Sequence, residues 1–114
     1  MTLKEIQALL SGELLTRGLG LEAECVKVFA SDLMSDVLAF MDPGSVLLTG
    51  LVNAHVVRTA RLAEAMAIVV VQGKRPDAGV VDEAMKNNVP IIATACSMFE
   101  ACARISGSFP EGRR

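Results

Sequence analysis

Aromatic residues are scarce in this sequence: its 114 residues include no tryptophan, no tyrosine and four phenylalanines. Because 52% of the residues are hydrophobic, the chain can still fill one core of the size usual for a single domain. That core has to be built from valine, leucine, isoleucine, alanine and six methionines. Runs of β-branched aliphatic residues favour buried strands, so we expect a sheet that is covered on both faces.

An excess of positive charge is also lacking. The formal net charge is −2, and the lysines and arginines are scattered along the chain, whereas a nucleic-acid footprint needs them massed on one face. The longest uninterrupted apolar run, 65–71, is far shorter than the roughly 20 residues of a membrane span. The first residues do not resemble a signal peptide. We therefore expect a cytoplasmic protein that binds neither nucleic acid nor membranes.

Cysteine and histidine are too few for a metal centre or a disulfide framework. Cys25, Cys96 and Cys102 make an odd count without a C-x-x-C spacing, and the single histidine, His55, has no cysteine at ligand spacing. Reduced thiols of an intracellular protein fit this pattern best. We expect no metal and no cofactor.

Four apolar blocks alternate with segments of helical periodicity at intervals of about twenty residues, which is typical of βαβ crossovers in a parallel sheet. The blocks are 25–30, 45–50, 66–73 and 89–95. Thr2 and Glu5 form a capping box for a first helix, Ser31-Asp32 is placed to cap the helix after the first block, and Asp77 and Ser97 are placed to begin later helices.

The fold we predict is a single α/β domain over residues 1–106, with a parallel or mostly parallel sheet of four to five strands and helices on both faces. Ser11-Gly12 ends the first helix, and in the segment 13–24 Gly18 and Gly20 mark a turn; we expect this segment to lead across the surface to the first strand. Residues 107–114 carry glycine, proline and charge without periodicity and are predicted to form a flexible tail.

Several stretches resemble the DRTGG domain family: SDLMSDVLA, LLTGL followed by VVRTA, VVQGKRP and SMFEAC. This module is similar to the N-terminal domain of bacterial HPr kinase/phosphorylase. It also occurs beside CBS domains in some inorganic pyrophosphatases and within some phosphate acetyltransferases. The resemblance runs from about Leu3 to Ile105. It implies a small regulatory or dimerising α/β module that is usually attached to an enzyme, and it supplies no catalytic residues to transfer to this chain.

The chain departs from the family at one strand end. Many relatives read Thr-Gly-Asp-Arg there, whereas this chain reads Thr49-Gly50-Leu51-Val52. The charged pair that would most readily hold a polar ligand is therefore replaced by two aliphatic residues.

In a parallel sheet, ligands bind beyond the carboxyl ends of the strands, where helix N-termini present unpaired N–H groups. Three such junctions predict a polar rim suited to a phosphate or carboxylate. Its candidate residues are Thr49, Gly50 and Asn53, then Gly73, Lys74 and Arg75, then Thr94 and Ser97, with His55 and Arg58 on the adjoining helix.

Structural roles compete with these functional ones. Gly50 can serve a backbone angle closed to other residues, and Asn53 can merely cap a helix. Arg58 can clamp an anion beside a pH-sensitive His55, or both can be surface or dimer contacts. Cys96 can be a reactive thiol at a helix N-terminus or a packed core residue, and we favour packing.

The function we expect is that of a stand-alone, non-catalytic, homodimeric regulatory module that senses a nucleotide or another phosphorylated metabolite. Self-association is expected because so small a hydrophobic chain leaves apolar side chains near its surface. The alternative is a ligand-free dimerisation module that docks on a partner enzyme. The third hypothesis, a small thiol-dependent enzyme using Cys96 or His55, is the least favoured.

Overall fold

The structure is a computed structural model that describes residues 1–108. Within these residues the chain forms five helices and five strands that alternate over most of its length. In chain order they are α1 (Leu3–Leu9), β1 (Glu13–Leu14), β2 (Val28–Ala30), α2 (Met34–Phe40), β3 (Val46–Thr49), α3 (Ala54–Leu62), β4 (Ala67–Val70), α4 (Ala78–Lys86), β5 (Ile91–Ala93) and α5 (Met98–Ser108).

The strands form one mostly parallel sheet in the order β1-β5-β4-β3-β2. Strands β2, β3, β4 and β5 pair in parallel with their neighbours, and β1 adds an antiparallel edge to β5. The predicted fold class is confirmed. Strand β1 opens the segment 13–24, so the expectation that this segment only leads across the surface to the first strand is wrong, although a turn is present at Gly18. The physical reason is tertiary: two residues with no periodicity become a strand because β5 offers them an unpaired edge.

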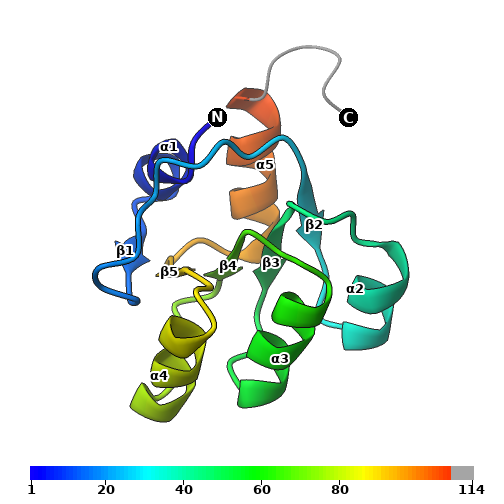
Figure 1. Ribbon diagram of the computed structural model, residues 1–114. Helices are drawn as coiled ribbons and strands as arrows, with labels where there is room; N and C mark the ends of the chain where they lie inside the picture. The colour runs from blue at the N-terminus through cyan, green and yellow to red at the C-terminus, as the bar shows by residue number, and fades with distance from the viewer. Residues whose placement is uncertain (109–114) are drawn as a thin grey trace.

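Helices cover both faces of the sheet (Figure 1). Helices α1 and α5 lie on one face, and α2, α3 and α4 lie on the other. The sheet separates two hydrophobic clusters, and successive strand residues alternate between them: Val46 and Leu48 pack with α1 and α5, whereas Leu47 packs with α2 and α3. All four residues of β3 are buried, as expected of a strand covered on both sides.

Most of the predicted helix starts are confirmed. Thr2 and Glu5 form the capping box of α1, and the Asp77 side chain accepts a hydrogen bond from the backbone N–H of Val80. The cap predicted at Ser31-Asp32 is wrong for Asp32: α2 begins at Met34 after Leu33, which has no side-chain cap. The Asp32 carboxylate instead binds the end of β3, where two buried donors need an acceptor.

The last helix, α5, continues to Ser108, three residues beyond its expected end at Ile105. The remainder of the predicted tail, 109–114, lies outside the described residues. Among the described helices, none has both the length and the apolar character that a membrane crossing demands.

Candidate functional site

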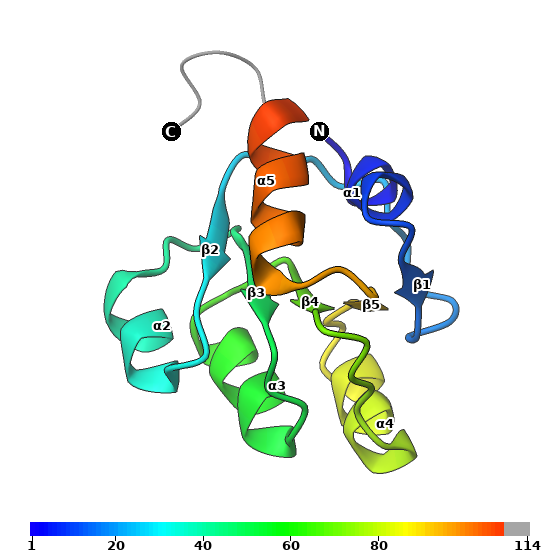
Figure 2. The same ribbon diagram turned by 180° about the vertical axis from the view of Figure 1, so that it is seen from behind.

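The loops that follow the parallel strands meet at one edge of the sheet. The N–H of Val71 donates to the carbonyl of Thr49 at 3.0 Å, and the N–H of Gly73 donates to the carbonyl of Thr94 at 3.0 Å. These bonds join the ends of β3, β4 and β5. Figure 2 shows the β3–α3 and β4–α4 connections on the side of the sheet that faces the viewer. The common carboxyl edge predicted from the sequence is therefore present.

A carboxylate is fixed at this edge by two hydrogen bonds. Asp32, which follows β2, accepts from the Thr49 hydroxyl at 2.8 Å and from the Gly50 N–H at 2.7 Å, both through Oδ1. The Thr49 hydroxyl in turn accepts from the N–H of Leu51 at 3.2 Å. Thr49 has no exposed surface. The Thr49 side chain and the Gly50 backbone thus hold Oδ1 of Asp32 at the end of β3, while Asp32 itself stays exposed.

Lys74 completes this arrangement from the next loop. A Cβ placed on Gly50 would lie 3.6 Å from Oδ2 of Asp32 and 3.6 Å from Nζ of Lys74. The hydrogen atom of glycine therefore leaves a small space between an anionic and a cationic group. We refer to Asp32, Thr49, Gly50 and Lys74 as the Asp32–Lys74 site.

The backbone explanation considered for Gly50 is wrong. Gly50 is absent from the residues with positive φ, whereas Gly73, with φ of 69°, and Gln72, with φ of 69°, do adopt the left-handed conformation. Strain in this region is therefore located in the turn after β4, where glycine suits one of the two positions. At Gly50 the absence of a side chain matters because it leaves space beside Asp32 and Lys74.

The two charged groups of the Asp32–Lys74 site have complementary hydrogen-bonding properties. An ionised carboxylate only accepts hydrogen bonds, and an ammonium only donates them. A ligand that satisfies both must carry hydroxyl or amino donors close to an anionic group. Phosphorylated sugars and nucleotides have this combination.

Three predicted site residues have structural roles. Asn53 caps α3 by accepting from the N–H of Val56, and Ser97 caps α5 by accepting from the N–H of Glu100. Thr94 is 3% exposed and donates its hydroxyl proton to the carbonyl of Leu10 at 2.7 Å. These side chains shape the edge of the sheet rather than face a ligand.

The remaining predicted residues are not drawn together by side-chain contacts. His55 and Arg58 are exposed on α3, and within residues 1–108 neither makes a side-chain hydrogen bond or ion pair. Arg75 points away from the Asp32–Lys74 site and pairs with Glu13. The structure therefore groups Thr49, Gly50 and Lys74 and leaves His55 and Arg58 apart.

The cysteines are packed to different degrees. Cys96 is 7% exposed, and its sulfur lies 3.8 Å from the carbonyl oxygen of Leu10. Burial raises the pKa of the Cys25 thiol and that of Cys102 above the ordinary value, which disfavours the reactive thiolate. The packing role favoured for Cys96 agrees with this geometry.

Sequence reasoning missed Asp32 as a site residue. Its position in the sequence could have indicated a site residue, because Asp32 comes two residues after the end of an apolar block. Polar residues follow the other apolar blocks in the same way. In parallel strands paired in register, such as Ala30 opposite Leu48, residues after neighbouring strand ends are brought close together.

This fold and edge define a small α/β domain whose polar groups gather beyond the carboxyl ends of parallel strands. The chain belongs to the DRTGG domain family, whose model matches residues 5–108. No curated protein shows a significant match.

A solved structure with a similar fold holds the CBS and DRTGG domains of the regulatory region of Clostridium perfringens pyrophosphatase, complexed with its activator, diadenosine tetraphosphate. The TM-score is 0.73 at 21% sequence identity. The match covers 96% of this chain and 47% of that one. The chain thus spans about half the length of this relative.

Proposed function

We propose that this DRTGG domain is a non-catalytic regulatory module that binds a phosphorylated metabolite, such as a nucleotide or sugar phosphate, at the Asp32–Lys74 site. The observation that carries the proposal is that a fixed carboxylate and a lysine ammonium both border the space above Gly50. Asp32 accepts hydrogen bonds from ligand hydroxyl or amino groups, and Lys74 binds the phosphate. Arg58 and His55 are exposed on the adjoining helix α3 and stand apart from this site, so only a ligand larger than a sugar phosphate would reach them.

The comparison with the pyrophosphatase supports this choice of ligand class. Its regulatory region, which contains a DRTGG domain, was solved with a nucleotide activator. A regulatory role also fits the chemistry of the site. Thr49 is the hydroxyl closest to the carboxylate, and because it is fully buried it cannot attack a bound ligand. We therefore expect the site to bind its ligand without catalysing a reaction on it.

Ribose 5-phosphate is a small probe with both required features, and adenosine 5′-monophosphate adds a base. In a thermal-shift assay, a ligand at a hundred times its dissociation constant stabilises the fold by about 2.7 kcal/mol. We expect a shift for wild type that is lost in Lys74→Ala and retained in Lys4→Ala, which removes an exposed lysine of α1. A shift that is equal in both variants would place the ligand elsewhere.

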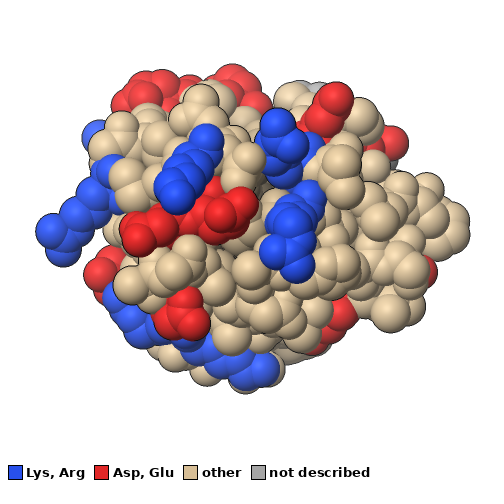
Figure 3. Space-filling model, turned by 60° about the horizontal axis from the view of Figure 1, so that its bottom comes forward, with Lys and Arg blue, Asp and Glu red and all other residues tan. Residues whose placement is uncertain are grey.

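Homodimerisation is the second part of the proposal, and an exposed apolar surface favours it. Val26, Leu33 and Phe40 are 52%, 57% and 69% exposed. The ion pair between Lys27 and Asp42 ties the segment before β2 to the segment after α2. Figure 3 shows few charged side chains on the right of the view, over α2. A second copy that covers this α2 surface would bury these side chains.

Sedimentation analysis tests the α2 surface directly. We expect Phe40→Ser to shift the protein toward monomer, and Phe99→Ser, which removes an 82% exposed phenylalanine of α5, to leave the dimer intact. The opposite result would move the interface to α5. If the dimer forms but no phosphorylated probe binds, the ligand-free docking module becomes the better account.

A further inference from the structure

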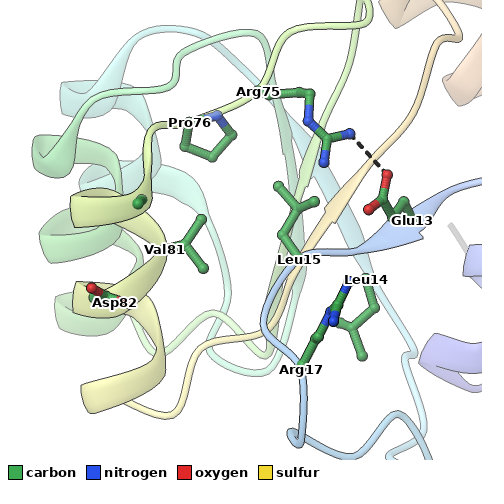
Figure 4. A pocket seen from close by; sticks show the side chains of 9 residues that line it. Glu13, Leu14, Leu15, Arg17, Arg75, Pro76, Val81 and Asp82 are labelled. Carbon is green, nitrogen blue, oxygen red and sulfur yellow. Dashed lines mark hydrogen bonds and ion pairs between the residues drawn. The ribbon is translucent and has the colours of Figure 1, made fainter.

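A groove lies between β1 with its following turn and the start of α4, beside the ion pair of Arg75 with Glu13 (Figure 4). It has a volume of about 240 Å³. Its floor is apolar, formed by Leu15, Pro76 and Val81, and the Val81 side chain points from α4 toward Leu15. We refer to this feature as the β1–α4 groove.

Two arginines from separate segments border the groove. Arg17 comes from the turn after β1, and Arg75 comes from the loop after β4. Arg75 Nη1 donates to Glu13 Oε1 at 2.9 Å. The hydrogen bond and charge of Arg75, with a smaller contribution from Arg17, lower the pKa of the Glu13 carboxyl. Glu13 therefore holds a negative charge in the field of both guanidinium groups. The other acidic residue of the groove, Asp82, lies on the α4 wall.

We propose that the β1–α4 groove is a second binding site, for a small ligand that joins one apolar ring to an anionic group. The ring packs on Leu15, Pro76 and Val81. The phosphate or carboxylate takes the place of the Glu13 carboxylate at Arg75 and also meets Arg17. Guanidinium groups bind such oxyanions with paired N–H donors.

The size and charge of the groove restrict the ligand. Pockets for drug-sized molecules usually hold about 300–1,000 Å³, so this groove suits a single ring rather than a dinucleotide. Asp82 disfavours a second anionic group at the α4 wall. The site is also distinct from the Asp32–Lys74 site, because Lys74 approaches Gly50 whereas the next residue, Arg75, turns to Glu13.

Phenyl phosphate is a probe with the required ring and anion and with no sugar hydroxyls. In a titration followed by amide chemical shifts, we expect the largest changes at the residues of the groove. Arg17→Ala should weaken binding about tenfold, the effect of one lost hydrogen bond between charged groups. Lys4→Ala, which removes an exposed lysine of α1 outside the groove, should leave the affinity unchanged.

Glu13→Gln gives a test that misfolding cannot imitate, because it should increase affinity. The substitution keeps the shape of the side chain and removes the negative charge that competes for Arg75, so phenyl phosphate should bind several-fold more tightly. Unchanged or weaker binding to this variant would overturn the proposal. Equal binding of inorganic phosphate would overturn the role of the apolar floor, and equal binding of benzyl alcohol would overturn the role of the arginines.

Discussion

Replacing Asp32 with alanine removes the acceptor that two donors of β3 share. The Thr49 hydroxyl and the Gly50 N–H donate to one carboxylate oxygen at 2.8 Å and 2.7 Å, and both residues are buried. A hydrogen bond to a charged group contributes about 1.5–3 kcal/mol, but water can enter the space left by this exposed side chain and replace part of each bond. We therefore expect Asp32→Ala to lower the free energy of unfolding by about 2 kcal/mol. For a domain of this length, that corresponds to a fall in Tm of about 8 °C.

Urea denaturation of a small set of variants checks this magnitude. Asp32→Asn keeps an acceptor oxygen and should lose about 1 kcal/mol or less. Asp82→Ala, which removes an exposed carboxylate of α4, should stay within about 0.5 kcal/mol of wild type. Combining Asp32→Ala with Thr49→Val should cost about 1 kcal/mol less than the sum of the single changes, because the two side chains share one hydrogen bond. An Asp32→Ala protein as stable as wild type, or additive single changes, would refute the reasoning.

Three further predictions concern glycine packing, thiol burial and the start of α5. Gly12→Ala should destabilise the fold by about 1–3 kcal/mol, because its Cβ would lie 2.5 Å from an isoleucine methyl of β5. Gly107→Ala in α5, where a Cβ would meet nothing within 4 Å, should raise the free energy of unfolding by about 0.5 kcal/mol. Urea denaturation measures both changes. Iodoacetamide should label Cys102 in the native protein before the two buried thiols, as mass spectrometry of peptides would show; early labelling of the others would contradict their burial. Hydrogen bonds from the backbone and side chain of Ser97 lower the pKa of Glu100. The contribution of these bonds to stability is therefore present above the ordinary glutamate pKa and is lost as the pH falls through the lowered pKa. Glu100→Gln should lose less stability on acidification than wild type.

Much of the fold could be predicted because its strands are buried on both faces. A continuous apolar run such as 67–70 is typical of a parallel strand that is covered on both faces. Strand β1 could not be found in this way. Glu13 and Leu14 are too few to show alternation, and their pairing with β5 depends on an edge that exists only in the folded sheet.

The site was harder to predict than the fold because polar side chains choose among competing partners. Asp32 stands where a helix cap is expected, yet the buried donors of β3 attract it more strongly than the nearby N–H groups of α2. Thr94 stands where a ligand contact is expected, yet it is turned inward to the carbonyl of Leu10. Both outcomes depend on partners distant in the sequence, so the local pattern places Asp32 and Thr94 at strand ends but does not tell which groups they bind.

Titration of the isotopically labelled protein with ribose 5-phosphate, followed by amide chemical shifts, is the most direct test of the proposed ligand site. The account predicts that the amides of Gly50, Leu51 and Lys74 shift together in a saturable manner, and that Lys74→Ala abolishes the effect. Saturable shifts confined to another part of the molecule, or no shifts at millimolar probe, would contradict it.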